Sequence, residues 1–445
     1  MKKLLISILL ILTFACVFVG CNSQGSDNSN IGTEGLVYYP LNDGTYAVGG
    51  GEAKYLSNII IPATYSNKPV TKIADNAFSN FEFSSITLPN SITSIGDSAF
   101  FNCDNIDNIT LPNNIVEIGD SAFASCNQLT NINIPTGVKN IANYIFFDCS
   151  KLANISILGN IENIGEFAFS ECTSLVNLNI PDCVKDIGNS AFYNCNKLET
   201  FELPNQLLNI GNSSFYNCIK ISTLTIPSSV TQIGAFAFYN CLNLSQINYN
   251  AVECLDSTED SAIFFGVGRA SGGVVLTVSE NVKKIPAYLF YSGKRDEAPI
   301  IKNIIFKEDG ICTSIGTRAF SLVRGFDKIK IPDSVIQIGN YAFTFCPNLN
   351  NVEIGNGTKS IGVQAFSGCS NLTEIVLGQS VESISYQAFS GCSNLAKAIF
   401  KNTNGWTVAP VLSSGHAISS EQLSDTSKAA AYLRTTYETY NWKRI

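Results

Sequence analysis

A repeat with a period of 23 residues constrains this chain more than any other feature of its sequence. An isoleucine followed by a small residue recurs at this spacing as Ile95-Gly96, Ile118-Gly119, Ile141-Ala142, Ile164-Gly165, Ile187-Gly188, Ile210-Gly211 and Ile233-Gly234, and again as Ile315-Gly316, Ile338-Gly339, Ile361-Gly362 and Ile384-Ser385. A phenylalanine stands five residues after each isoleucine, and Ile73 with Phe78 opens the series one residue out of step. Units this short cannot each enclose a core, so they must stack into a one-dimensional solenoid.

The unit that begins at Ile95 indicates how one coil folds. Ile95, Ala99 and Cys103 share one face of a helix, for which Asp97 is a suitable N-cap. Residues 106–111 end in the alternation of apolar and polar side chains that is typical of a half-buried strand, and Pro112 ends it. We therefore expect an α/β repeat solenoid with one short parallel strand and one short helix per coil.

The repeat also predicts the domain boundaries. We expect the solenoid over residues 73–400, with irregular, insert-bearing repeats at 249–314, where Ile285 and Phe290 keep the pattern. Residues 35–72 are expected to form an N-terminal β cap, because the segment 38–46 has the Asp-Gly turn of a β-hairpin. Residues 401–445 are expected to form a C-terminal cap with a short helix near residues 427–434.

The N-terminus carries an export signal. Lys2 and Lys3 precede an apolar run from Leu4 to Val19, which is short for a membrane-spanning helix, so residues 1–20 are predicted to be a signal peptide. Residues 18–21 resemble a bacterial lipobox, which implies that Cys21 is acylated and that the protein is an exported, membrane-anchored lipoprotein of the bacterial cell surface. An uncleaved anchor and an ordinary secretory signal are the alternatives. Residues 21–34 are predicted to be a flexible tether.

Composition excludes several functions. Charged residues are only 14% of the chain and the net charge is −8, whereas a nucleic-acid partner requires a basic surface. His416 is the single histidine, which removes Ser-His-Asp and Cys-His catalysis from the repeats, as well as zinc sites built from several imidazoles. We expect no catalytic residues, no cofactor and no metal.

Ten of the fifteen cysteines occupy one repeat position: Cys103, Cys126, Cys149, Cys172, Cys195, Cys218, Cys241, Cys346, Cys369 and Cys392. Equivalent residues of stacked coils lie about 5 Å apart, a distance that a disulfide tolerates. Their side chains all point the same way into the core, however, and free cysteine packs as a small hydrophobic residue. We predict buried, reduced thiols, with disulfides and metal binding as alternatives.

The pattern Ile-Gly-x-x-Ala-Phe-x-x-Cys-x-x-Leu-x-x-Ile-x-Ile-Pro, over roughly residues 55–400, resembles the BspA-type, or treponemal, leucine-rich repeat. One departure from ordinary leucine-rich repeats is a degenerate Asn/Cys ladder position, occupied by Asn114, Asn160 and Cys183 but by other residues in most coils. The resemblance implies a surface adhesin that binds host matrix proteins, plasma proteins or other cells.

The strand alternation predicts which side chains leave the core and could bind a partner. The predicted binding residues are Asn108, Thr110, Asn131, Asn133, Asn154, Ser156, Asn177 and Asn179. We expect a monomer that binds a protein or glycoprotein on host matrix or other cells through this sheet, and that contacts the membrane only through its lipid anchor.

Two other functions stay open at this stage. One is a structural spacer or envelope component without a specific ligand. The other, more remote, is a carbohydrate-active enzyme, because Glu353 and Glu374 are diagonal neighbours on adjacent strands, about 7–8 Å apart. A cross-strand ion pair between Lys330 and Glu353 would explain these charges without catalysis.

Overall fold

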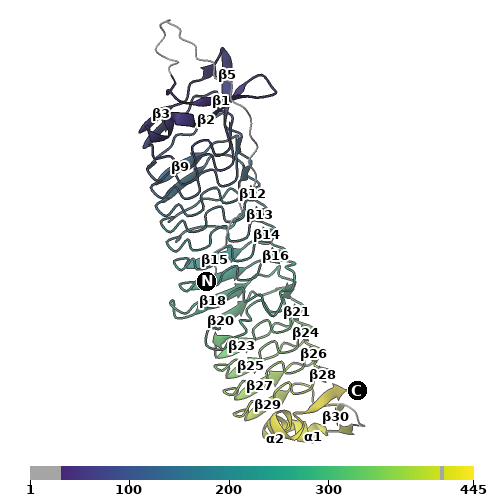
Figure 1. The fold of residues 1–445 in the computed structure, drawn as a ribbon. Helices are drawn as coiled ribbons and strands as arrows, with labels where there is room; N and C mark the ends of the chain where they lie inside the picture. Colours follow the sequence, from purple (N-terminus) through teal and green to yellow (C-terminus); the bar gives the residue numbers. More distant parts are fainter. Residues whose placement is uncertain (1–31, 411–414) are drawn as a thin grey trace.

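The computed structural model describes residues 32–410 and 415–445 and shows an elongated solenoid of stacked coils (Figure 1). Each regular coil contributes strands to one or both of two parallel ladders, which run along the two sides of the ribbon in Figure 1. The stacked, parallel arrangement that the repeat predicts is therefore confirmed, and the second ladder is an addition to the single strand expected in each coil.

The first ladder contains the strands that the sequence predicts. Its members are β3 (Asn58–Ile60), β6 (Ser85–Thr87), β9 (Asn131–Ile134), β11 (Asn154–Ile157), β15 (Thr223–Ile226), β17 (Gln246–Tyr249), β18 (Val274–Val278), β20 (Ile300–Phe306), β22 (Arg324–Gly325), β23 (Lys328–Lys330), β25 (Asn351–Glu353), β27 (Glu374–Leu377) and β29 (Lys397–Phe400). Equivalent residues of successive repeats pair, so that Asn131 lies opposite Asn154 and Ile132 opposite Ile155.

The second ladder is formed at the repeated isoleucines. Its members are β2 (Tyr46–Gly49), β5 (Lys68–Ile73), β7 (Ser94–Ile95), β8 (Glu117–Ile118), β10 (Asn140–Ile141), β12 (Asn163–Ile164), β13 (Asp186–Ile187), β14 (Asn209–Ile210), β16 (Gln232–Ile233), β19 (Lys284–Ile285), β21 (Ser314–Ile315), β24 (Gln337–Ile338), β26 (Ser360–Ile361) and β28 (Ser383–Ile384). The glycine after each isoleucine has a steric reason. A Cβ on Gly188 would lie 2.7 Å from the backbone of Glu166 in the preceding coil.

Different elements close the two ends. At the N-terminal end, β1 (Val37–Pro40) pairs antiparallel with β2, which confirms the expected hairpin, and η1 (Gly51–Tyr55) and β4 (Thr64–Tyr65) flank it. The C-terminal end consists of β30 (Trp406–Pro410), β31 (His416–Ala417), α1 (Ser420–Ser424), α2 (Thr426–Ala431), the π-helical turn η2 (Tyr432–Thr436) and β32 (Tyr440–Arg444). The short helix expected near residues 427–434 is thus present.

From β5 onward, the segment after each second-ladder strand is a run of turns, and the helix expected there is wrong. In the coil of Ile95, Ser98 and Asn102 have φ angles of 52° and 56°, in the left-handed region that a right-handed helix excludes. Asp97 is therefore not a helix N-cap. Its carboxylate instead accepts a hydrogen bond from the backbone N–H of Asp120 in the next coil, at 2.9 Å.

The hydrogen bonds of this segment explain why it resembles a helix in sequence. The N–H of Ala99 closes a turn onto the carbonyl of Gly96 at 3.3 Å, whereas the N–H of Phe100 donates to Ala122 of the next coil at 2.8 Å. Two consecutive four-residue turns bury every fourth residue, which is nearly the helical spacing. Half of the N–H groups thereby bond to the neighbouring coil, so the turns add to the cohesion between coils.

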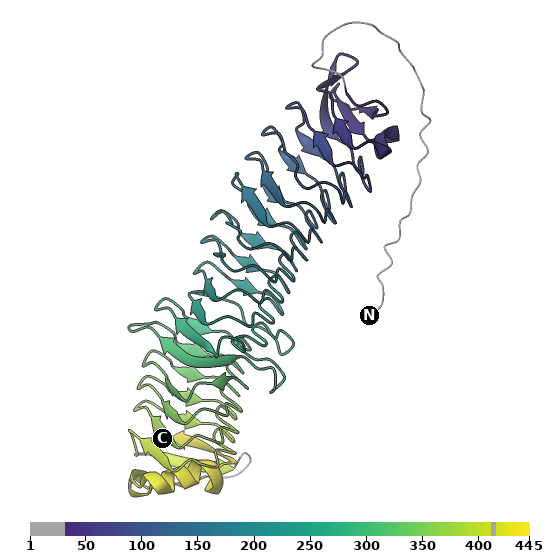
Figure 2. The ribbon, with the colours of Figure 1, turned by 90° about the vertical axis from the view of Figure 1, so that its left-hand side faces the viewer.

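The core contains a continuous column of phenylalanine rings. From Phe78 to Phe389 the rings stack with adjacent centroids 4.8–5.7 Å apart. In the irregular region 249–314 the column is kept by Phe264 and Phe290, which indicates two repeats stretched by insertions where the sequence pattern predicts one or two. Figure 2 shows loops of this region projecting beyond the neighbouring coils.

Polar side chains also connect the coils, at a position other than the degenerate one noted in the sequence. At this position an Asp or Asn oxygen accepts the backbone N–H of the next coil at 2.8–3.3 Å, and we call the set the acceptor ladder. It comprises Asp75, Asp97, Asp120, Asn143, Asn189, Asn212, Asp256 and Asn340. The degenerate position contributes side-chain donors instead, such as Asn114 to the carbonyl of Asn90 at 2.7 Å.

Candidate binding face

The first ladder carries all eight side chains that the sequence assigns to a binding surface. Asn108, Thr110, Asn131, Asn133, Asn154, Ser156, Asn177 and Asn179 are exposed, and we call them the amide face. The residues between them point inward, and Ile132 and Leu178 are each only 3% exposed. The outward orientation predicted from the alternation is therefore confirmed for all eight residues.

One column of the amide face is bonded to itself. The side-chain amide of Asn154 donates to the side-chain oxygen of Asn131 at 2.8 Å, and the Asn131 amide donates to Thr130 at 2.8 Å. The hydroxyl of Thr200 donates to the side-chain oxygen of Asn177 one coil further. These side chains already satisfy part of their hydrogen-bonding capacity within the protein.

The neighbouring column of the amide face lacks such side-chain hydrogen bonds. Among the described residues, the side chains of Thr110, Asn133, Ser156 and Asn179 have no hydrogen-bond partner, although Asn131 on the same strand as Asn133 has two. An asparagine side chain offers two donors and one acceptor, and a hydroxyl offers one donor. This column therefore presents unpaired polar groups to the exterior, one in each of four successive coils.

The ladder is interrupted within the amide face. The coils of Asn108, Asn177 and Thr200 pair with their neighbours through single bridges instead of a full strand. In the Thr200 coil an inward position that is Ile or Leu in the neighbouring coils is Phe201, whose ring centroid lies 4.7 Å from that of Phe215. The larger side chain gives a local reason for the poor strand pairing there.

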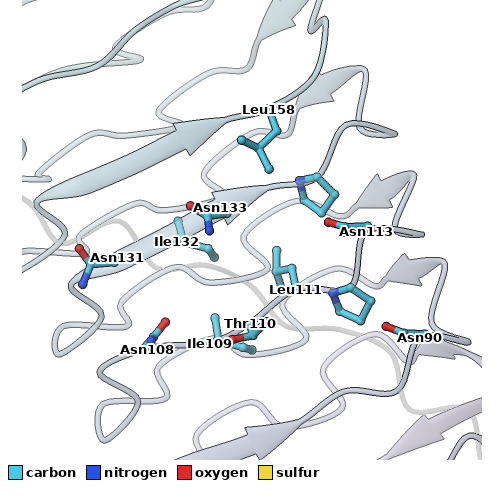
Figure 3. Close-up of a pocket in the computed structure, with 12 residues that line it drawn as sticks. Asn90, Asn108, Ile109, Thr110, Leu111, Asn113, Asn131, Ile132, Asn133 and Leu158 are labelled. Atoms are coloured by element: carbon cyan, nitrogen blue, oxygen red, sulfur yellow. The ribbon is translucent and has the colours of Figure 1, made fainter.

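A hollow lies at the first of these interruptions. It has a volume of about 520 Å³ and is bordered by residues of the coils of Asn108 and Asn131, and we call it the amide hollow. Figure 3 shows Thr110 and Asn133 on adjacent coils, with Asn90 and Asn113 at the turns that follow two strands and Leu158 approaching from a third coil. The volume lies in the range of small-molecule sites, about 300–1,000 Å³.

The hollow includes residues that the sequence analysis missed. Asn90 and Asn113 each follow the proline that ends a strand, and their side chains have no hydrogen-bond partner among the described residues. Leu158 stands where most coils have that proline, and it is 54% exposed. Its departure from the Ile-Pro pattern of the repeat is a signal that was visible in the sequence.

Charge appears only further along the sheet. A second hollow, of about 600 Å³, is bordered by Asn179 at the end of the amide face and includes Asp182 and Glu202. A third, of about 380 Å³, is lined by lysines and glutamates of the C-terminal coils. The amide face is thus the uncharged part of a sheet that becomes charged toward its C-terminal end.

The two acidic residues weighed as a catalytic pair are diagonal, as expected, because Glu353 lies opposite Val376 while Glu374 pairs with Asn351. The expected ion pair between Lys330 and Glu353 is wrong. Glu353 lies 3.8 Å from the ammonium of Lys401, two coils away, and Glu374 lies 3.0 Å from Lys397. Both carboxylates thus have cationic partners at the surface.

The ten column cysteines are buried, as predicted. Each thiol donates a hydrogen bond at 3.0–3.3 Å to the carbonyl of a core phenylalanine in the preceding coil, as Cys172 does to Phe146. Burial raises the pKa of Cys126 to about 12 and holds that of Cys172 well above its usual value. In the described part of the chain, no cluster of three or more His, Cys, Asp or Glu residues is arranged to hold a metal ion.

The predicted signal peptide at 1–20, Cys21 with its predicted acylation, and most of the predicted tether lie outside the described residues. Within residues 32–410 and 415–445, no helix has the length and apolar character needed to cross a membrane. His416 lies in the C-terminal cap, where its Nε2 is 3.0 Å from the hydroxyl of Tyr437.

Stacked coils, paired parallel ladders and an exposed polar sheet define a repeat protein of the leucine-rich-repeat solenoid class. The family model of the BspA-type leucine-rich repeat region, which spans six copies of the repeat, matches residues 71–199, 139–262, 185–304 and 283–406. The chain therefore belongs to the BspA-type leucine-rich-repeat family.

The chain is also similar to solved structures. A leucine-rich-repeat protein from Bacteroides ovatus is 24% identical with a TM-score of 0.54, over 77% of this chain and 93% of that one, which shows the same fold. A leucine-rich cell surface protein from Faecalibacterium prausnitzii is 23% identical with a TM-score of 0.40, over 83% of this chain and 88% of that one. The leucine-rich-repeat protein of T. pallidum is 25% identical with a TM-score of 0.36, over 48% and 90%. No curated protein matches the chain.

Proposed function

We propose that this protein is a surface-anchored recognition protein that binds a macromolecule of another cell or of the extracellular matrix through its amide face. The observation that carries the proposal is the column of Thr110, Asn133, Ser156 and Asn179, which are exposed and have no hydrogen-bond partner within the described residues. A solenoid repeats such groups with fixed geometry, and several weak contacts along a rigid array add up through multivalency.

Membership in the BspA-type family supports the proposal, since the resemblance implies adhesion. The fold supports it as well, because solenoids use extended surfaces for binding. In this role the protein requires no cofactor and no metal, and it acts by recognition instead of catalysis. The partner is a protein or glycoprotein.

The test replaces Thr110, Asn133, Ser156 and Asn179 together with lysine. Because these side chains are exposed and form no internal hydrogen bonds, the fold and thermal unfolding should be unchanged. Four positive charges in place of neutral groups should weaken binding to host cells and immobilised matrix by at least tenfold. Binding is measured by biolayer interferometry on matrix preparations and by flow cytometry on cells.

The control places the same number of lysines on or directly before strands of the second ladder, at the exposed positions Val116, Leu208, Gln232 and Gln337. Ser125 and Asn194, in the turn segment, are poor controls, because both have φ angles near 59° and the Asn194 amide is bonded to Glu171. If the two variants lose binding equally, or neither does, the amide face is not the recognition surface, and a structural spacer becomes the better explanation.

Anchoring is part of the proposal and has its own test. An acylated Cys21 would hold the protein on the outer side of a membrane, with residues 22–34 as the connection to the solenoid. Mass spectrometry of the membrane fraction should find a diacylated or triacylated N-terminal cysteine, and a Cys21→Ala variant should leave that fraction. A mature protein that begins elsewhere, or a variant that stays bound to the membrane, contradicts the lipid anchor.

A further inference from the structure

We infer that the amide hollow binds a neutral oligosaccharide, so that the partner's glycan, and not its polypeptide, is what this face contacts. The inference rests on the proposed function only in placing the partner on the amide face. It adds the chemical class of the ligand and the coils that hold it. The charge, the side-chain types and the unpaired polar groups of the hollow carry it.

Charge restricts the ligand first. The residues that line the amide hollow include no Asp, Glu, Lys or Arg. The remaining positions of the amide face are neutral too, and the nearest acids in a hollow of the sheet are Asp182 and Glu202, in the second hollow that Asn179 also borders. A sulfated or uronic-acid glycan, a phosphorylated ligand or a strongly charged peptide would find no countercharge here, so these ligands are disfavoured.

Side-chain type argues against a protein surface as the direct contact. Protein-binding hot spots are enriched in Trp, Tyr and Arg, which fill pockets of the partner. The amide hollow contains none of these residues, and its largest exposed apolar side chain is Leu158. The aromatic and arginine side chains that could act as anchors are therefore absent from the amide hollow.

The polar groups of the hollow match sugar hydroxyls. Among the described residues, Asn90, Asn108, Thr110, Asn113 and Asn133 all line it with side chains that have no hydrogen-bond partner. An amide can donate to one hydroxyl and accept from its neighbour, and a sugar ring presents hydroxyls as adjacent donor–acceptor pairs. In the absence of charge, such pairing is what the hollow can offer a ligand.

The floor of the hollow complements the other face of a sugar. Leu111 and Leu158 contribute apolar surface beside these amides (Figure 3). Pro112 and Pro135 line the hollow as well. A pyranose ring has C–H groups on its faces and hydroxyls at its edge, so it can cover an apolar floor while its edge reaches polar walls. Leu158, which replaces the usual proline, enlarges this floor from a third coil.

The array is longer than one sugar. Thr110, Asn133, Ser156 and Asn179 occupy four successive coils, and three steps of about 4.8 Å span about 14 Å along the ladder. A linear segment lying along the solenoid can therefore contact several coils, with the amide hollow as one of its subsites. We expect weak affinity for a monosaccharide and increasing affinity with chain length.

The experiment titrates the purified protein with neutral hexasaccharides of glucose, N-acetylglucosamine, mannose and galactose, and with heparin hexasaccharide as the acidic comparison. Saturation-transfer NMR detects the complex, and calorimetry gives its affinity. At least one neutral hexasaccharide should bind, and heparin should not. The double variant Asn113→Ala/Asn133→Ala should weaken that binding about tenfold, as loss of two ligand hydrogen bonds does.

The matched control is Asn371→Ala/Asn394→Ala, which removes two exposed amides from distant C-terminal coils and should leave binding unchanged. A second arm treats host cells with mild periodate, which cleaves vicinal diols of glycans and leaves polypeptides intact. Cell binding should then fall. If no neutral hexasaccharide binds and periodate has no effect, the glycan inference is overturned, whereas the lysine variant's loss of cell binding would still support the proposed function.

Discussion

Phe169 shows how one side chain of the repeat holds a coil in place. Its ring is fully buried and lies between Phe146 at 5.7 Å and Phe192 at 5.2 Å. Its carbonyl accepts the thiol of Cys195 at 3.1 Å. The residue therefore contributes to the core of three coils. If its ring were removed, the neighbouring side chains could fill the space only by leaving their own places in the phenylalanine column.

We predict that Phe169→Ala lowers the free energy of unfolding by about 3–5 kcal/mol, the usual cost of truncating a buried phenylalanine. Urea denaturation followed by circular dichroism measures it. Phe169→Leu fills much of the volume and should cost less. An unchanged midpoint for Phe169→Ala would mean that this position does not face the core.

The column cysteines make stability depend on pH. Burial raises the pKa values of nine of them in the folded protein, to about 12 for Cys126, whereas thiols in the unfolded chain ionise near pH 8.5. Between these values the unfolded state has released protons that the folded state keeps, so unfolding becomes more favourable as the pH rises. Their contribution to stability is complete below about pH 8.5 and declines above it.

We predict that the free energy of unfolding, measured in urea with a reductant, falls steadily from pH 8 to pH 10.5. Each thiol whose pKa burial raises contributes up to about 1.4 kcal/mol per pH unit. The variant Cys149→Ala/Cys172→Ala should lose less stability per pH unit than the wild type, whatever its stability at pH 7. Equal slopes would show that these thiols are oxidised or are ionised in the folded state.

At the scale of the elements, the turn segment shows what the sequence can and cannot predict. The spacing of Ile95, Ala99 and Cys103 correctly identifies the buried residues, because two four-residue turns bury nearly the same positions as a helix. It does not distinguish the two backbones, since the difference lies in Ser98 and Asn102, whose positive φ angles leave no trace in apolar periodicity. The first-ladder strands were predictable because alternation has a period that no other element shares.

The candidate site was predictable to the same extent. Alternation identified the exposed residues of the amide face, since orientation follows from local backbone geometry. It could not locate the amide hollow, because Asn90, Asn113 and Leu158 meet only through the stacking of coils. Nor could it separate the bonded Asn131 from the unpaired Asn133, which depends on neighbours 23 residues away.

The acceptor ladder gives a prediction for the element that joins the coils. The side-chain oxygen of Asn212 accepts the backbone N–H of Ala235 at 2.8 Å. Asn212→Ala removes this acceptor and should lower the free energy of unfolding by about 1 kcal/mol. The amide of Ala235 should also exchange its hydrogen faster, as mass spectrometry of the corresponding peptide can measure. Asn212→Asp keeps the acceptor and should change neither quantity much. If the two variants behave alike, the ladder does not contribute to cohesion.

At the scale of the whole molecule, the ends of the solenoid require protection, because a parallel ladder exposes unpaired backbone groups at its last coil. The C-terminal cap provides it. Strand β32 pairs antiparallel with β28, and the side chain of Asn441 accepts the N–H of Tyr386 at 2.9 Å, in place of a further coil. The buried indoles of Trp406 and Trp442 cover the last core residues beside Phe400.

We predict that removal of residues 401–445 converts a monomer into end-to-end oligomers. Without the cap, β28 and β29 present open edges over an exposed core, and a second copy can extend the stack much as another coil would. Light scattering coupled to size-exclusion chromatography should find a monomer for the full chain, and larger species whose mass grows with concentration for the shortened one. Trp442→Ala, which keeps β32 but empties part of the cap, should destabilise the C-terminal coils in hydrogen exchange without causing association. A shortened chain that stays monomeric and melts at the same temperature would show that the solenoid's last coil closes itself, and that residues 401–445 serve some purpose other than capping.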